Sequence, residues 1–190
     1  MLSTNEFNLD DQKLKYILEL ERKQNFSNFI SKNKYVLNDE MLIELKDWIL
    51  NHLNMYFKDL MKYVDAEIYI TQSWINYTNF KQSHHRHNHG NSLISGVFYF
   101  DEGNTPIVFT DPINKFPLKI NKSESNLFND SQISYNTRKN QLMLFPSLLD
   151  HEVGVQDTEK IRMSLSFNTW VKGIIGRDEH SNKLIVGDAT

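Results

Sequence analysis

The sequence contains no cysteine among its 190 residues, and this absence removes several classes of site at once. Disulfide bonds, zinc ribbons, thiolate nucleophiles and iron–sulfur clusters all require cysteine, so all four are excluded. A chain without cysteine also fits a reducing compartment, where disulfides do not persist. The chemistry of this protein therefore rests on other side chains.

Long apolar runs and blocks of positive charge are also missing. The first fifteen residues, MLSTNEFNLDDQKLK, are polar and acidic where a secretory signal needs an apolar segment. No apolar run approaches the ~20 residues that a membrane-spanning helix requires. The net charge is −3, with lysine and arginine scattered among acids. We therefore expect a cytoplasmic protein whose main partner is neither a membrane nor a nucleic acid.

The N-terminal third carries helical patterns. Apolar residues recur at helical spacing in residues 8–24 and 36–64. The stripe of the second segment consists of Met41, Leu45, Trp48, Ile49 and Tyr56, with Asn38 or Asp39 as a candidate N-cap. We interpret both stripes as core packing. His52, on the second stripe, is predicted to be a packing residue and not a ligand.

From residue 66 onward the pattern changes to β-structure. Short runs of β-branched and aromatic residues, separated by turn residues, cover 66–77, 92–100, 106–110, 140–146, 151–156 and 161–170. Because no helical pattern separates them, an antiparallel sandwich or barrel is predicted, not a parallel sheet. Residues 121–140 are polar and are predicted to form a long loop of the kind that often serves as a binding lid.

These patterns predict a single domain over residues 1–190. The helices of residues 1–65 should pack on the outside of a β core formed by residues 66–175. Residues 176–190 would then form a C-terminal tail. The helices also offer a candidate homodimer surface.

The stretch SHHRHNHGNSLISG, residues 83–96, holds four of the seven histidines. If residues 85–89 are extended, His85, His87 and His89 point to one face of the strand and His84 points to the other. Two imidazoles spaced two residues apart can bind one metal ion. A solvated loop rich in histidine explains the pattern equally well at this point.

A fifth histidine and an arginine strengthen the metal interpretation. His151 follows His87 by 151 − 87 = 64 residues, and a barrel can bring such distant strand ends together. After it, IRMSLSFNTW alternates apolar residues with Arg162, Ser164, Ser166 and Asn168. An exposed edge strand would explain this alternation. A guanidinium followed by small hydroxyls also suits a carboxylate pocket.

A metal ligand and an anion clamp in one cavity are typical of non-haem Fe(II) oxygenases. These enzymes leave coordination positions open for a 2-oxo acid and for O₂. The sequence also resembles the 2-oxoglutarate/Fe(II)-dependent oxygenases of bacteria and bacteriophages, whose substrates are mostly unassigned. The resemblance covers roughly residues 66–175 and rests on SWIN (73–76), HNHGNSLISGVFYF (87–100), FTDP (109–112), LFPSLLDHEV (144–153) and RMSLSFN (162–168).

The resemblance implies a fold, cofactors and roles. The fold would be mainly β (α+β), a double-stranded β-helix or cupin-like jelly roll preceded by helices. The reaction would be a hydroxylase-type dioxygenation of an unidentified substrate, using Fe(II), 2-oxoglutarate and O₂, in the cytoplasm of a bacterium or a phage-infected cell. By position, the iron ligands would be His87, His89 and His151. The 2-oxoglutarate contacts would be Arg162 and Ser164, with Tyr99 and Asn76 as further contacts.

The ligand set departs from the usual pattern of this family. Most 2-oxoglutarate oxygenases have H-x-D or H-x-E, whereas position 89 supplies an imidazole, and Gly90 stands where proline is frequent. Three histidines would remove one negative charge from the iron and should raise its potential. Alternatively, His89 supports the site without binding the metal, and either a carboxylate such as Asp101 or Asp111 is recruited or no carboxylate is. On spacing alone, the pair His85 and His87 is also open.

Two other functions fit the same residues. A cupin-type three-histidine metalloenzyme without 2-oxoglutarate would use Arg162 to clamp a carboxylate of its own substrate. A non-catalytic jelly-roll module would use the histidine stretch to bind a partner or a carbohydrate. Asp150 and Glu152 flank His151 and should point away from its face of an extended strand.

Overall fold

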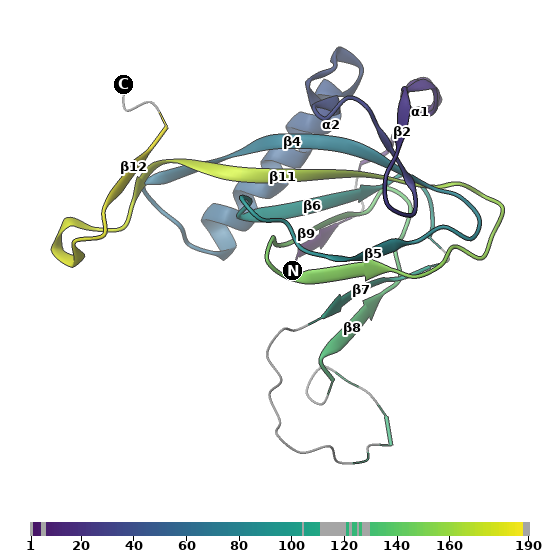
Figure 1. Ribbon diagram of the computed structural model, residues 1–190. Coiled ribbons are helices and arrows are strands. Elements are labelled where there is room, and N and C mark those ends of the chain that lie inside the picture. Colours follow the sequence, from purple (N-terminus) through teal and green to yellow (C-terminus); the bar gives the residue numbers. More distant parts are fainter. Residues whose placement is uncertain are drawn as a thin grey trace.

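The computed structural model describes residues 2–4, 7–103, 105–110, 121, 123–124, 126 and 130–187. These residues form two antiparallel sheets, with helices against the outer face of the larger one (Figure 1). The helical elements are α1 (Asp11–Glu19), η1 (Val36–Asn38), η2 (Glu40–Leu42), α2 (Ile43–Asn54), the π-helix η3 (Met55–Leu60) and η4 (Asp178–His180). None of these helices is long and apolar enough to cross a membrane.

The two sheets draw strands from the whole chain. The larger sheet runs β1 (Leu2–Thr4), β9 (Leu142–Pro146), β6 (Ile94–Tyr99), β11 (Arg162–Ile175), β4 (Ala66–Thr78), β3 (Phe29–Ser31) and β2 (Arg22–Gln24), with β12 (Leu184–Val186) paired to β11. The smaller sheet runs β5 (His84–His87), β10 (Asp150–Val153), β7 (Ile107–Thr110) and β8 (Gln132–Tyr135).

Apolar side chains cover both faces of the larger sheet. On the outer face, Phe98 and Leu165 belong to the same core as Leu45, Ile49 and Leu53 of α2. On the inner face, a second cluster joins the two sheets, formed by Val97, Tyr99, Ile107, Phe109, Met143, Phe145 and Val153. Because both faces are covered, the strand β6 is buried at every position. The α2 helix therefore packs on the outer face of the larger sheet.

Strand β11 lies in the middle of the larger sheet, between β6 and β4. Its apolar residues face the helices, and Leu165 is fully buried there. Its polar face includes Arg162 and Ser164, which are only 4% and 3% exposed. The alternation in this segment is therefore not that of an exposed edge strand. It places polar groups between the two sheets.

The N-terminal region differs from its prediction in two ways. Residues 1–65 contain three short strands, β1, β2 and β3, as well as helices. In addition, α2 begins at Ile43 after two 3₁₀ turns, and neither Asn38 nor Asp39 caps it. The Asp39 carboxylate instead accepts hydrogen bonds from Tyr16 and Asn33. That carboxylate therefore ties the segment between β3 and α2 to the helix α1.

His52 has the packing role predicted for it. It is half-buried, its Nδ1 donates to the Trp48 carbonyl at 2.9 Å, and the two rings lie 4.2 Å apart.

Two predicted irregular segments contain strands. Within residues 121–140, β8 pairs with β7 as the last strand of the smaller sheet. Residues 111–120, and 122, 125 and 127–129 within the predicted lid, lie outside the described residues. Within the predicted tail, β12 pairs with the end of β11 and forms the projecting ribbon in Figure 1. With four residues in β8 and three in β12, these strands are too short to be recognised from a periodic sequence pattern.

Gly96 should be intolerant of any side chain. It lies opposite Phe167 in the β6–β11 pair, and an added Cβ would overlap the Phe167 ring. Overpacking a filled core costs about 1–3 kcal/mol, so Gly96→Ala should lower the melting temperature by several degrees. Gly90→Ala is the control, because an added Cβ there meets no atom within 4 Å. Equal melting temperatures for both variants would contradict this packing, as measured by circular dichroism.

Candidate metal centre

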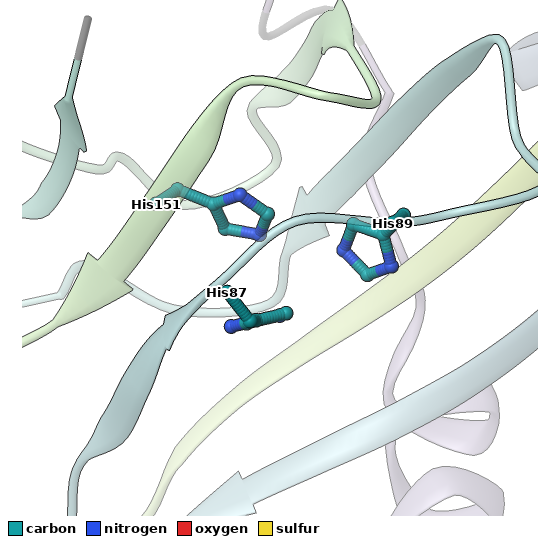
Figure 2. A group of neighbouring side chains, drawn as sticks. All are labelled: His87, His89 and His151. Atoms are coloured by element: carbon teal, nitrogen blue, oxygen red, sulfur yellow. The ribbon is translucent and has the colours of Figure 1, made fainter. Parts of the chain in front are cut away.

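Three histidines from two distant segments of the chain lie close together between the sheets. His87 is the last residue of β5, His89 follows it by two residues, and His151 lies in β10. The pairing of β10 with β5 places His151 directly opposite His87. The ligand nitrogens lie within 4.8 Å of one another, and Figure 2 shows the three rings around a common space. Strand pairing thus closes a separation of 64 residues.

Backbone carbonyls orient two of these imidazoles. His87 Nδ1 donates to the His85 carbonyl at 2.7 Å, and His151 Nδ1 donates to the Leu149 carbonyl at 3.0 Å. Because a carbonyl only accepts, each ring carries its proton on Nδ1 and keeps the Nε2 lone pair available. Histidines that ligate metals are usually held by such an outer hydrogen bond.

Burial keeps the three imidazoles neutral. Desolvation is the main cause, and it lowers the pKa of His89 to about 3 and that of His151 to about 4. The pKa of His87 is lowered for the same reason. Neutral imidazole is the form that binds metal. The donor set therefore fits a divalent transition metal such as iron.

No carboxylate belongs to this group among the described residues. Asp101 accepts a hydrogen bond from the Met163 backbone at 3.3 Å. Asp150 is bound to Arg86 and Asn88, as expected for a side chain pointing away. Glu152, for which the same was expected, lines the cavity but is not part of the ligand group. Asp111 lies outside the described residues. Within the part of the chain that the structure describes, the group is therefore made of imidazole alone.

His85 also lies outside the group. Its ring lies 4.6 Å from that of Phe26, which is 83% exposed. The pair His85 and His87, which the spacing left open, is therefore not the pair that joins His151.

His84 occupies a position that its spacing did not predict. It lines the same cavity as His87, not the opposite face of the strand. The cause is a β-bulge: His87 faces His151 and His84 faces Val153, so two residues of β5, at positions 85 and 86, oppose the single residue 152 of β10. Burial lowers the pKa of His84 to about 3, and Asn28 Nδ2 lies 2.6 Å from its Nε2.

A buried arginine and a buried tyrosine line the same cavity. Arg162 Nε and Nη2 have no hydrogen-bond partner among the described residues, and neither does the Tyr99 hydroxyl. The guanidinium carbon lies 5.3 Å from the centroid of the Tyr99 ring. A buried donor without a partner costs about 1–3 kcal/mol, and more when it is charged. A ligand carboxylate would satisfy all of these donors at once.

Hydroxyl groups continue the polar wall next to Arg162. Asn76 Nδ2 lies 2.8 Å from Ser166 Oγ and 3.5 Å from Ser164 Oγ, linking β4 to β11. The histidines, Arg162, Tyr99, Ser164 and Asn76 all line one cavity of about 330 Å³. All seven site residues predicted from sequence thus lie in one cavity.

The family model described as "Putative 2OG-Fe(II) oxygenase" matches residues 72–168. This span is 97 of the 190 residues (168 − 72 + 1 = 97) and runs from β4 to β11. The chain belongs to this family. As a member of this oxygenase family, it uses Fe(II), 2-oxoglutarate and O₂. The prediction of the family and its cofactors is therefore confirmed, and the cupin-type and non-catalytic alternatives are set aside.

Solved structures share the fold of this oxygenase. HygX of Streptomyces hygroscopicus, with nickel and 2-oxoglutarate bound, has a TM-score of 0.61 at 9% identity, covering 84% of this chain and 76% of HygX. An oxidoreductase of the 2OG-Fe(II) oxygenase family from Burkholderia pseudomallei has a TM-score of 0.55 at 11% identity, covering 83% and 76%.

A prolyl hydroxylase of Trichoplax adhaerens, in complex with a hypoxia-inducible-factor peptide, has a TM-score of 0.60 at 12% identity, covering 89% and 82%. None of the curated proteins compared with the oxygenase matches it. These similarities confirm the predicted jelly roll.

Proposed function

We propose that this oxygenase binds Fe(II) through His87, His89 and His151 and anchors 2-oxoglutarate through Arg162. The observation that carries the proposal is the buried Arg162, which lies in the same cavity as the three imidazoles and has two donors without a partner among the described residues. A metal group without an anion clamp would suit many enzymes. The combination suits a co-substrate that chelates a metal at one end and bears a carboxylate at the other.

The side chains divide the work between metal and co-substrate. The Nε2 atoms of His87 and His151 hold the iron, together with a ring nitrogen of His89. The guanidinium of Arg162 takes the C5 carboxylate, and the hydroxyls of Tyr99 and Ser164 donate to the same group. Asn76 orients Ser164 and offers a further polar contact. When bound, iron, 2-oxoglutarate and O₂ supply oxidative decarboxylation to succinate and CO₂, with one oxygen atom hydroxylating the substrate.

Aromatic side chains shield the metal group from water. The Phe145 and Phe109 rings lie 4.9 and 5.9 Å from that of His151, which is 5% exposed. A dry surrounding strengthens the ionic contacts in the cavity and limits side reactions.

We also propose that residues 1–190 work as one domain, because α1 and α2 share their core with β4, β6 and β11.

Anaerobic addition of Fe(II) and then 2-oxoglutarate should produce a weak visible charge-transfer band, because the co-substrate chelates the metal. Admitting O₂ should then yield succinate even without the primary substrate, at a slow uncoupled rate. Absorption spectroscopy and chromatography of the acids measure the two steps. Stoichiometric iron binding with neither band nor succinate would contradict the proposal.

A further inference from the structure

Arg162 and Trp74 line the same cavity from well-separated backbone positions. Arg162 pairs with Thr78 in the β4–β11 ladder, and Trp74 lies four residues back along β4. At a rise of about 3.3 Å per residue, the backbone positions of Thr78 and Trp74 are roughly 13 Å apart. The terminal carboxyl carbons of an extended five-carbon diacid are only about 5 Å apart. The wall around Trp74 is therefore left for another ligand.

A lysine without an acidic partner stands at this wall. Lys34 lines the cavity, is half-buried and holds its Nζ 5.6 Å from the centroid of the Trp74 ring. No carboxylate of the described residues lies within ion-pair distance of it. Burial, followed by the charge of Lys23, lowers the pKa of Lys34 to about 8. The ammonium group is thus partly stripped of water and without a compensating charge.

Lys23 adds a second cation at the rim. It lies opposite Ile30 in the β2–β3 pair, and Ile30 lines the cavity. Directly opposed residues of an antiparallel pair project on the same side of the sheet, so Lys23 is on the cavity side. By contrast, the exposed Lys32, between Ile30 and Lys34 in sequence, pairs with Glu21 at 3.0 Å. Among the described residues, Lys23 and Lys34 thus place two positive charges without an ion pair at this mouth, in a cavity whose lining also includes Glu152.

Trp74 joins this charge to the metal group. Its Nε1 donates to Asn76 Oδ1 at 3.2 Å, and its ring lies 5.9 Å from that of His89. The indole thus offers a fixed apolar surface between Lys34 and the metal ligands. A molecule resting on it would extend from the ammonium group towards the reacting position.

We propose that Lys34 and Trp74, with Lys23 at the rim, bind the primary substrate, and that this substrate is a small molecule bearing a carboxylate or phosphate group. The proposal rests on the proposed function, because it requires Arg162 to be occupied by 2-oxoglutarate. A cavity of about 330 Å³ is at the small end of small-molecule sites. The anionic group is the end that Lys34 holds, and the carbon to be oxidised lies nearer His89.

Minimal fluorinated anions test this site. The protein is loaded with paramagnetic Mn(II) in place of Fe(II) and with saturating 2-oxoglutarate, and probe binding is followed by fluorine NMR. Trifluoroacetate and monofluorophosphate represent the two anion types, and trifluoroacetamide is the neutral isostere. Because Mn(II) broadens only nearby nuclei, probes on surface lysines contribute little. The fluorine signal of at least one anion should be broadened. The anion that binds more tightly indicates whether the substrate carries a carboxylate or a phosphate group.

Lys34→Met should lower the affinity for that anion at least fivefold, whereas Lys34→Arg should keep the wild-type affinity. The matched control, Lys32→Met, should bind as the wild type does. Three outcomes would overturn this inference alone. The signal of the neutral amide could be broadened as much as those of the anions, neither anion's signal could be broadened, or Lys34→Met could bind the anion with unchanged affinity. A protein that binds neither Mn(II) nor 2-oxoglutarate in the same titration would instead contradict the proposed function, and this inference with it.

Discussion

Replacing Arg162 with methionine should weaken 2-oxoglutarate binding by about a hundredfold and make the ligand-free protein more stable. The wild-type guanidinium is 4% exposed, and two of its nitrogens have no partner among the described residues. A hydrogen bond to a charged group contributes about 1.5–3 kcal/mol, and every 1.4 kcal/mol is a factor of ten in affinity. Loss of a two-pronged contact therefore gives a loss of roughly a hundredfold.

The rise in stability has the same origin as the loss of binding. A buried charge without partners destabilises the ligand-free fold, and methionine fills a similar volume without polar atoms. The ligand-free variant should therefore melt at a higher temperature than the wild type. Added 2-oxoglutarate should raise the melting temperature of the wild type and leave the variant unchanged.

Calorimetric titration of the Mn(II)-loaded protein measures the affinity, and thermal unfolding measures the stability. Arg138→Met is the control, because Arg138 is exposed and should affect neither quantity. Arg162→Lys keeps the charge but loses the planar fork, so its affinity should lie between those of wild type and Arg162→Met. An unchanged affinity in Arg162→Met would place the carboxylate elsewhere in the cavity.

Alanine at His87 or His151 should lower iron affinity by more than a hundredfold. Loss of an outer hydrogen bond to a ligand already costs 10–100-fold, so loss of the ligand itself should cost more. Iron per chain after gel filtration, measured by plasma mass spectrometry, gives the occupancy. His84→Ala is the matched control: it removes a buried histidine of the same cavity that is not part of the ligand group. Iron loss in this control would show that any buried histidine affects binding.

The role of His89 needs its own variants. His89→Ala should lose iron like the other two, whereas His89→Asp should retain it, because a carboxylate is also an accepted iron ligand. The aspartate adds a negative charge beside the metal and should lower its reduction potential relative to the wild type. Full iron occupancy and activity in His89→Ala would mean that only two histidines bind the metal.

Local sequence patterns predicted many of the residues of the site. The alternation in β11 identified Arg162 and Ser164, because period-two alternation is a property of a strand whatever surrounds it. The H-x-H spacing left two candidate pairs open, His85 with His87 and His87 with His89, and the resemblance to the oxygenase family favoured the second pair. The ordered set of motifs predicted the family and hence the jelly roll and cofactors, which the comparisons confirmed.

Other features have no local signal. The bulge that turns His84 into the cavity arises where β5 pairs with β10, whose paired residues His87 and His151 are 64 residues apart in the sequence. No residue in either strand signals a bulge by its type. The strands β1, β2 and β3 have three residues each, too few for a periodic pattern. They form because the edges of the larger sheet offer unpaired backbone groups.

By itself, the sequence determined the fold class, the family and the residue types of an iron and 2-oxoglutarate site, because these depend on local periodicity and motif order. Only the tertiary structure decided three features of the described residues: the three imidazoles converge without a carboxylate, Arg162 is buried with two donors that have no partner, and Lys34 lies beside Trp74 without an ion pair. Each of these depends on which side chains from distant strands share a cavity. Convergence, burial and missing partners belong to the folded chain alone.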